Sequence, residues 1–333
     1  MNTSREIARY LAIVVSTVVI LVTLLSLLFD VNVWWIKALD FPRPQCWTVA
    51  IICLVAFISL NTRWSFWPWF LLIGLAASIG LQSYFIYPYT PLAQKALKQA
   101  NQKEITAGAT VSLLIANVYM YNRQTSEFLH IASHTDPDMI LVMETDQWWI
   151  DQLQPLRKHY KYYHEYPVDN TYGLALYSRF PMMNTQIMFF NHDSVPSFHT
   201  TVQLPNQKSF RFHGVHPVPP VYSKHPDNQG KQEVALLKVG HLLSQNEGST
   251  IVAGDFNDVA WSNTSRLFQV EGQLLDARVG RGLYNSFDAT SWLMRWPLDH
   301  VYASEEFHLI SLEHLGKFGS DHFPVYAELV LIE

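Results

Sequence analysis

The first 87 residues contain three long stretches without a charged residue, and this feature limits the fold more than any other. The stretches run from Tyr10 to Phe29, from Pro44 to Leu60 and from Trp64 to Tyr87. About 20 helical residues at a rise of about 1.5 Å span roughly 30 Å, the thickness of the hydrocarbon core of a bilayer. A signal peptide is the alternative for the first stretch, but it lacks a small-residue cleavage site and two more apolar stretches follow it. We therefore predict that residues 1–87 form a membrane anchor of about three transmembrane helices.

The residues in and around these stretches favour an anchor over a transport path. The stretches contain no Asp, Glu, Lys, Arg or His, and ionisable groups usually mark an ion pathway through a membrane. Six of the 11 tryptophans lie before residue 70, where they would act as interfacial anchors. The basic residues near the spans do not decide the orientation, because three fall on one side and five on the other.

The rest of the chain has the composition of a water-soluble domain. All 14 histidines lie at or beyond His130. Residues 88–105 are polar and are predicted to form a linker, which leaves residues 106–333 as a second domain. Acidic residues outnumber basic ones beyond residue 87, so a basic surface for gripping nucleic acid is not expected. Both cysteines lie in the second apolar stretch, which excludes a Cys zinc site or a disulfide framework in the soluble part.

Seven apolar runs in this second part predict β-strands. They cover residues 111–120, 139–145, 172–178, 210–217, 250–257, 298–304 and 323–332. Residues 125–134 and 231–245 have the apolar spacing of helices. Strands that alternate with helices predict an α/β domain with buried sheets. Residues 182–200 fit no element clearly.

Polar residues gather at the ends of these predicted strands, where open α/β sheets usually bind their ligands. In chain order they are Asn117, Glu144, His216, Asp255, Asn257, Asp321 and His322. Each one alone has an ordinary explanation, as a turn residue or a helix cap. Together they combine oxygen ligands that suit Mg²⁺ with histidines that can exchange protons. This combination favours the hydrolysis of a phosphate ester.

Several short motifs make the prediction more specific. The strongest pair is GDFN (residues 254–257) followed by SDH (320–322). Five further motifs support it: ANV (116–118), ILVMET (140–145), YGLALYSRFP (172–181), VHP (215–217) and LDHVYAS (298–304). In this order, over about 220 residues, the motifs resemble those of the endonuclease/exonuclease/phosphatase superfamily. The resemblance implies a DNase I-like fold, which is a four-layer α/β sandwich of two packed mixed sheets flanked by helices.

The resemblance also implies a metal site. Glu144 would be the principal ligand of Mg²⁺, with Mn²⁺ as the alternative ion, and Asn117 and Asp321 would lie near it. Tyr119 and Met120 stand where many family members have polar groups, so one metal ion is expected rather than two.

The catalytic roles follow from the same resemblance. Asp255 and Asn257 would orient the attacking water and the phosphate, and His216 would stabilise charge on the phosphoryl oxygens. His322, oriented by Asp299, would exchange protons. His213 and His300 stand next to these motifs but are expected to be structural, because alternation along a strand turns His300 away from the face of Asp299.

The sequence leaves several functions open. The substrate could be a nucleic acid, a phospholipid or an inositol phosphate. The expected partner of the helices is the lipid bilayer, and no obligate protein partner is predicted. A catalytically silent membrane scaffold with the same fold is the alternative. The resemblance favours a bacterial inner-membrane protein whose catalytic domain lies outside the cytoplasm.

Overall fold

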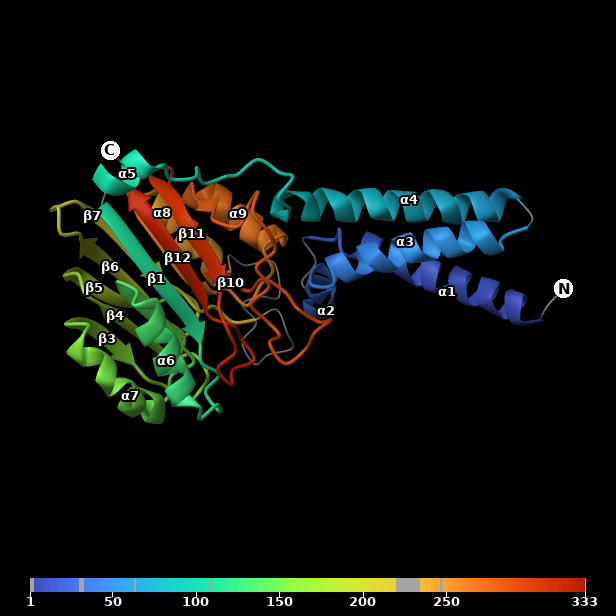
Figure 1. Cartoon of the computed structure of the whole chain (residues 1–333). Coiled ribbons are helices and arrows are strands. Elements are labelled where there is room, and N and C mark those ends of the chain that lie inside the picture. Colours follow the sequence, from blue (N-terminus) through green and yellow to red (C-terminus); the bar gives the residue numbers. More distant parts are fainter. Residues whose placement is uncertain are drawn as a thin grey trace.

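The computed structural model describes residues 3–29, 33–62, 64–107, 109–219, 234–245 and 248–332. Three long helices lie together at one side of the molecule, and two β-sheets with their own helices lie at the other (Figure 1). The division agrees with the change in composition along the chain.

The helical part consists of α1 (Thr3–Leu25), α3 (Arg43–Leu60) and α4 (Phe66–Ile86), with the short helix α2 (Trp34–Lys37) and the 3₁₀ turn η1 (Ala38–Asp40) between the first two. In the described part of the chain, the three long helices have the length and apolar composition needed to cross a membrane. They pack through small and apolar side chains such as Ala50 and Leu75. The three predicted apolar stretches therefore form helices long enough to cross a membrane, and Arg63, in the predicted turn, lies outside the described residues.

Two six-stranded sheets form the other part. The first contains β1 (Ala109–Asn117), β2 (Met139–Met143), β3 (Tyr162–Tyr166), β4 (Leu174–Ser178), β11 (Phe307–His314) and β12 (Val325–Leu331), in the order β11-β12-β1-β2-β4-β3. The second contains β5 (Met182–Phe189), β6 (Pro196–Gln203), β7 (Ser209–Gly214), β8 (Thr250–Asp255), β9 (Leu275–Asp276) and β10 (Asp299–Ala303), in the order β5-β6-β7-β8-β10-β9.

The sheets pack face to face, and helices cover their outer faces. Leu141 and Leu329 of the first sheet meet Phe212 and Val301 of the second in one buried core. The outer face of the first sheet packs on α6 (Thr125–Thr135) and α7 (Gln147–Leu153). The outer face of the second packs on α8 (Ala235–Ser244) and α9 (Asn263–Gly272). The predicted four-layer sandwich is confirmed.

All seven predicted strands are present, and β3, β5, β6, β9 and β11 are additional. Residues 182–200, which fitted no element, contain β5 and most of β6. β6 escaped prediction because several polar side chains, including His199 and Thr200, are buried in it. Nδ1 of His199 lies 2.6 Å from Nδ1 of His213 in β7, and burial lowers the pKa of both rings. His213 is therefore part of the sheet's interior.

The segment predicted as a linker lies along the sandwich. Leu97 is fully buried in the core between the sheets, and the backbone N–H of Ala100 donates to the carbonyl of Leu309 (2.9 Å). The hydroxyl of Tyr89 donates to the carbonyl of Ala260 (2.6 Å). A short helix, α5 (Gln102–Ala107), then leads into β1. These contacts attach the sandwich closely to the end of α4.

The glycine of GDFN is required by the approach of two chain segments. Gly254 has φ +147°, and a Cβ atom there would lie 1.9 Å from the carbonyl oxygen of Val215. The backbone N–H of Val215 also donates to the carbonyl of Ala253 (3.0 Å). Glycine is the residue that fits such a position without strain, and this close approach brings His216 beside Asp255.

We expect Gly254→Ala to destabilise the sandwich by about 3 kcal/mol or more, because the backbone must move to relieve the clash. The thermal midpoint of the full chain in detergent, followed by circular dichroism, should fall by on the order of 10 °C. Gly316→Ala is the matched control, because a Cβ atom there meets nothing within 4 Å. Equal midpoints for the two variants would contradict this explanation of Gly254.

Candidate active site

The side-chain amide of Asn117 joins two carboxylates that come from different sheets. Asn117 is the last residue of β1 and Asp255 is the last residue of β8. The Nδ2 group of Asn117 donates to Oε1 of Glu144 (2.9 Å) and to Oδ2 of Asp255 (3.0 Å). Its Oδ1 atom accepts from the backbone N–H of Tyr119 (2.9 Å), which fixes the orientation of the amide.

Glu144 reaches this cluster from an uncommon backbone conformation. It follows β2 directly and has φ +61°, a left-handed conformation that costs a non-glycine residue on the order of 1 kcal/mol. The backbone N–H of Met120 donates to Oε2 of Glu144 (3.2 Å). Burial raises the pKa of Glu144 to about 7, against the hydrogen bonds from Asn117 and Met120. A partly buried carboxylate held in this way is suited to bind a cation.

Asp255 is fully buried at the centre of the site. Its Oδ1 atom accepts from the backbone N–H of Asn257 (2.8 Å). Its Oδ2 atom lies 3.7 Å from Nε2 of His216 and 3.5 Å from Nε2 of His322. Burial raises the pKa of Asp255, and the His322 ring opposes this effect. The side-chain amide of Asn257 donates to the carbonyl of Pro217 (3.0 Å). This bond connects the segment after β8 with the segment after β7, beside Asp255.

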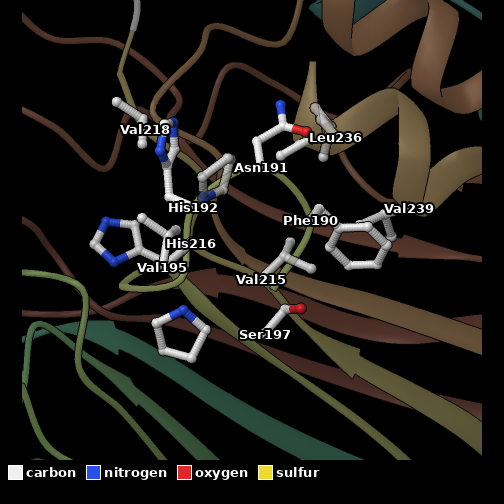
Figure 2. A pocket seen from close by; sticks show the side chains of 13 residues that line it. Phe190, Asn191, His192, Val195, Ser197, Val215, His216, Val218, Leu236 and Val239 are labelled. Atoms are coloured by element: carbon white, nitrogen blue, oxygen red, sulfur yellow. The ribbon is translucent and has the colours of Figure 1, made fainter. Parts of the chain in front are cut away.

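His216 is buried, and neither ring nitrogen has a hydrogen-bond partner among the described residues. Burial lowers its pKa to about 4, so the ring is neutral at pH 7. Figure 2 shows the ring at the edge of a small cavity lined mainly by apolar side chains, among them Val195 and Val218. An orphaned polar ring beside a buried carboxylate is a candidate for binding a substrate oxygen.

His322 forms the closest contact between ionisable groups in the site. Its Nδ1–H group donates to Oδ2 of Asp299 (2.7 Å). Burial alone would lower the pKa of His322, but the carboxylates of Asp299 and Asp255 together raise it to about 10. Asp299 begins β10, which pairs antiparallel with β8 so that Asp299 stands opposite Asp255. The sheet register therefore brings both carboxylates to the same imidazole.

Asp321 lies at the margin of the cluster. Its carboxylate is partly buried, and its Oδ1 atom lies 3.4 Å from the hydroxyl oxygen of Ser320. Burial raises its pKa, and His322 opposes this effect. The other seven residues predicted for the site are linked to one another by the contacts above. Asp321 directly precedes His322 in the chain and lies at the rim of the site.

Two groups in the described part of the chain could hold a metal ion. One is formed by Glu144 and the neighbouring Asn117, with Asp321 at the rim. The other consists of Asp255, Asp299 and His322, whose ligand atoms lie within 4.8 Å of one another. In the second group the hydrogen bond from His322 to Asp299 already uses one ligand atom of each residue. Oxygen donors suit Mg²⁺ and Mn²⁺ better, so the chemistry of the first group fits such an ion more closely.

Supporting residues that the sequence did not reveal hold the backbone at Asp299 and His322. The hydroxyl of Ser286 accepts from the backbone N–H of Asp299 (3.0 Å). The hydroxyl of Ser320 donates to the carbonyl of Asn117 (2.8 Å) and accepts from the backbone N–H of His322 (3.0 Å). The ring of Phe287 lies 4.9 Å from that of His322. Ser320 stands in the SDH motif and could have been found there, whereas no motif marks Ser286 or Phe287.

His300 lies in the buried interior, away from the cluster. It stacks on Phe256 with ring centroids 4.6 Å apart, and its Nε2 atom is 2.9 Å from the carbonyl of Asp258. Burial and the nearby Arg278 lower its pKa. Its place in the packing agrees with the structural role expected for it.

Comparisons with known proteins place this fold and site in a family. A model of the Endonuclease/Exonuclease/phosphatase family matches residues 114–322, which is more than half of the chain and includes every residue of the cluster. No curated protein matches the sequence significantly.

Three solved structures share the fold. TDP2 of D. rerio, complexed with a single strand DNA product, is 12% identical over 66% of this chain and 99% of its own, with a TM-score of 0.54. The human Nocturnin catalytic domain with bound sulfate is 17% identical over 67% and 95%, with a TM-score of 0.54. An endonuclease/exonuclease/phosphatase family protein of Bacteroides thetaiotaomicron is 16% identical over 68% and 99%, also with a TM-score of 0.54. Because the family model matches more than half of the chain and includes the whole cluster, this chain belongs to the endonuclease/exonuclease/phosphatase family of phosphoester hydrolases.

Proposed function

We propose that this chain is a membrane-anchored phosphoesterase that requires one Mg²⁺ or Mn²⁺ ion. The observation that carries the proposal is the Asn117 amide, which holds the carboxylates of Glu144 and Asp255 together. On one side of the amide lies the carboxylate suited to a metal ion, and on the other lies the Asp255–His322–Asp299 arrangement suited to proton transfer.

Glu144 would be the principal ligand of the ion in this proposal, with Asn117 and Asp321 near it. When bound there, the ion would supply positive charge to the phosphoryl group and would lower the pKa of a nearby water molecule. The fit rests on the donor set, because the hydrogen bonds from Asn117 and Met120 hold the Glu144 carboxylate in place. Hard cations prefer such oxygen donors.

The remaining residues carry the proton transfers. Asp255 takes a proton from the attacking water. Asn257, whose backbone N–H donates to the Asp255 carboxylate, helps to orient this water. As the new P–O bond forms and the ester P–O bond breaks, His322 gives a proton to the leaving oxygen. The proton on Asp255 then returns to His322, whose Nε2 atom is 3.5 Å away. Asp299 holds the ring in place, and His216 stabilises charge on a phosphoryl oxygen.

Two of the related structures support a tetrahedral anion as the group that binds. The D. rerio TDP2 structure holds a single strand DNA product, and the human Nocturnin structure holds a sulfate anion. In this chain the corresponding group is the phosphate of an ester, whether it belongs to a nucleic acid, a phospholipid or an inositol phosphate.

We expect Glu144→Gln to weaken Mn²⁺ binding by more than about tenfold, because the amide lacks the negative charge that holds the cation. Isothermal titration of the full chain in detergent measures the affinity, and hydrolysis of bis-p-nitrophenyl phosphate measures turnover, which should fall with it. Glu127→Gln is the control, because Glu127 is exposed on α6. Unchanged Mn²⁺ affinity and turnover in Glu144→Gln would exclude Glu144 as the ligand.

We expect Asp299→Asn and His322→Ala each to lower kcat by roughly 100-fold or more, because the two side chains act as one unit. The double variant should then be little worse than either single variant. The same assay of kcat checks the cycle, with His241→Ala on the exposed face of α8 as the control. Fully additive losses would mean that Asp299 does not act through His322.

We also propose that the anchor lies in a bacterial inner membrane with the sandwich outside the cytoplasm. Three helices that could each cross once would put residue 3 and the sandwich on opposite sides. In a chain with Cys46→Ser, Cys53→Ala and Tyr162→Cys, an impermeant maleimide should label the new cysteine on intact spheroplasts, because Tyr162 is exposed on β3. Labelling that requires lysis would place the sandwich in the cytoplasm.

A further inference from the structure

A loop of the sandwich exposes three consecutive large apolar side chains. Trp292 is 85% exposed, Leu293 is 56% exposed and Met294 is 44% exposed. In the described part of the sandwich no other run of three large apolar residues is exposed in this way. A contiguous exposed apolar patch usually marks a surface that binds something, and a tryptophan at such a tip is typical of a membrane interface.

Hydrogen bonds within the loop hold it in a defined shape. The hydroxyl of Ser291 accepts from the backbone N–H groups of Leu293 (3.2 Å) and Met294 (2.9 Å). The carboxylate of Asp288 accepts from the backbone N–H (2.7 Å) and hydroxyl (2.6 Å) of Thr290. The three apolar side chains therefore project from a closed turn.

The tip lies against the start of α3, at the end of the helical part that faces the sandwich. The side-chain amide of Gln45, in the first turn of α3, donates to the carbonyl of Leu293 (3.0 Å). The ring of Phe41, just before α3, meets that of Trp296 edge to face at 5.7 Å. Figure 1 shows the orange loops that follow α9 reaching the anchor beside α2. The exposed tip is thus continuous with the end of the anchor where α3 enters the membrane.

The base of the same loop forms a wall of the candidate active site. Phe287 pairs with His322 across an isolated bridge, and the backbone N–H of Ala289 donates to the carbonyl of Asp321 (2.7 Å). Two cations stand beside it: the guanidinium of Arg295 lies 5.0 Å, and the ammonium of Lys317 5.9 Å, from the ring centroid of Phe323. The apolar tip and Arg295 therefore belong to one loop, whose base contacts Asp321 and His322.

We propose that Trp292, Leu293 and Met294 are seated in the headgroup region of the bilayer that holds the anchor, and that the site acts on a phosphate ester carried by a lipid of that bilayer. The bilayer is the occupant because the anchor already brings it to the tip, through the contact of Gln45 with Leu293. Arg295 and Lys317 suit the phosphate of a headgroup. The substrate class rests on the proposed phosphoesterase function, whereas the seating of the loop does not.

The first test measures the seating of the loop. The full chain with Cys46→Ser, Cys53→Ala and Leu293→Cys carries an environment-sensitive dye on the new cysteine, in vesicles of phosphatidylcholine and phosphatidylglycerol. Lipid with a nitroxide near the headgroup should quench this dye strongly. It should not quench the same dye on Tyr162→Cys, since β3 lies on the side of the sandwich away from the anchor (Figure 1). Equal, weak quenching at both positions would overturn the proposal and indicate a protein partner for the tip.

The second test measures substrate choice with two esters that share a leaving group. Hexadecyl p-nitrophenyl phosphate is placed in the vesicles, and methyl p-nitrophenyl phosphate is dissolved in the water. The unaltered chain should hydrolyse the hexadecyl ester faster than the methyl ester. In the triple variant Trp292→Ser, Leu293→Ser, Met294→Ser the ratio of these two rates should fall about tenfold. A triple variant that keeps the full preference would refute the role of the tip. If the unaltered chain hydrolyses neither ester, the proposed function fails, while the quenching result still decides where the loop lies.

Discussion

The hydrogen bonds from the side-chain amide of Asn117 connect the two sheets at the end where the chemistry is placed. Apolar packing holds the sheets together but is not directional, so it does not by itself set the distance between a carboxylate of one sheet and a carboxylate of the other. The amide sets this distance for Glu144 and Asp255. The antiparallel pairing of β8 and β10 then puts Asp299 opposite Asp255, and His322 fits between the two carboxylates. Without the amide, the carboxylates of Glu144 and Asp255 would lie near each other without a shared hydrogen-bond donor. Such an arrangement of buried charges destabilises the folded state.

Much of the fold could be predicted because its strongest constraints are local. A helix that crosses a bilayer needs a long apolar run, and such a run can be read from the sequence. The three stretches before residue 88 are runs of this kind. Strands covered on both faces are recognisable as apolar runs, and β1, β2 and β8 are of this kind. β5 and β6 could not be found in this way. β5 lies at a sheet edge and has mostly exposed residues without a strict alternation. β6 buries His199 and Thr200 through side-chain contacts that only the folded chain provides.

The candidate site was predictable where it depends on strand ends. Asn117 ends β1 and Glu144 directly follows the parallel strand β2, so their proximity results from the pairing of these two strands. The contact of Asn117 with Asp255 depends on how the sheets pack, and no sequence pattern reports that. The same holds for Ser286 and for the loop from Asp288 to Trp296, which reaches both the active site and the anchor. These contacts join segments far apart in the chain, as the bond between Gln45 and Leu293 illustrates.

The position of the metal ion distinguishes the proposed chemistry from its nearest competitor in the described part of the chain. The direct measurement is a crystal structure of the full chain grown with Mn²⁺, in which anomalous scattering locates the ion. The proposal predicts a peak about 2.1 Å from a carboxylate oxygen of Glu144, beside Asn117 and Asp321. A peak enclosed by Asp255, Asp299 and His322, with Glu144 out of reach, would contradict it and would mean that the imidazole binds metal instead of carrying protons.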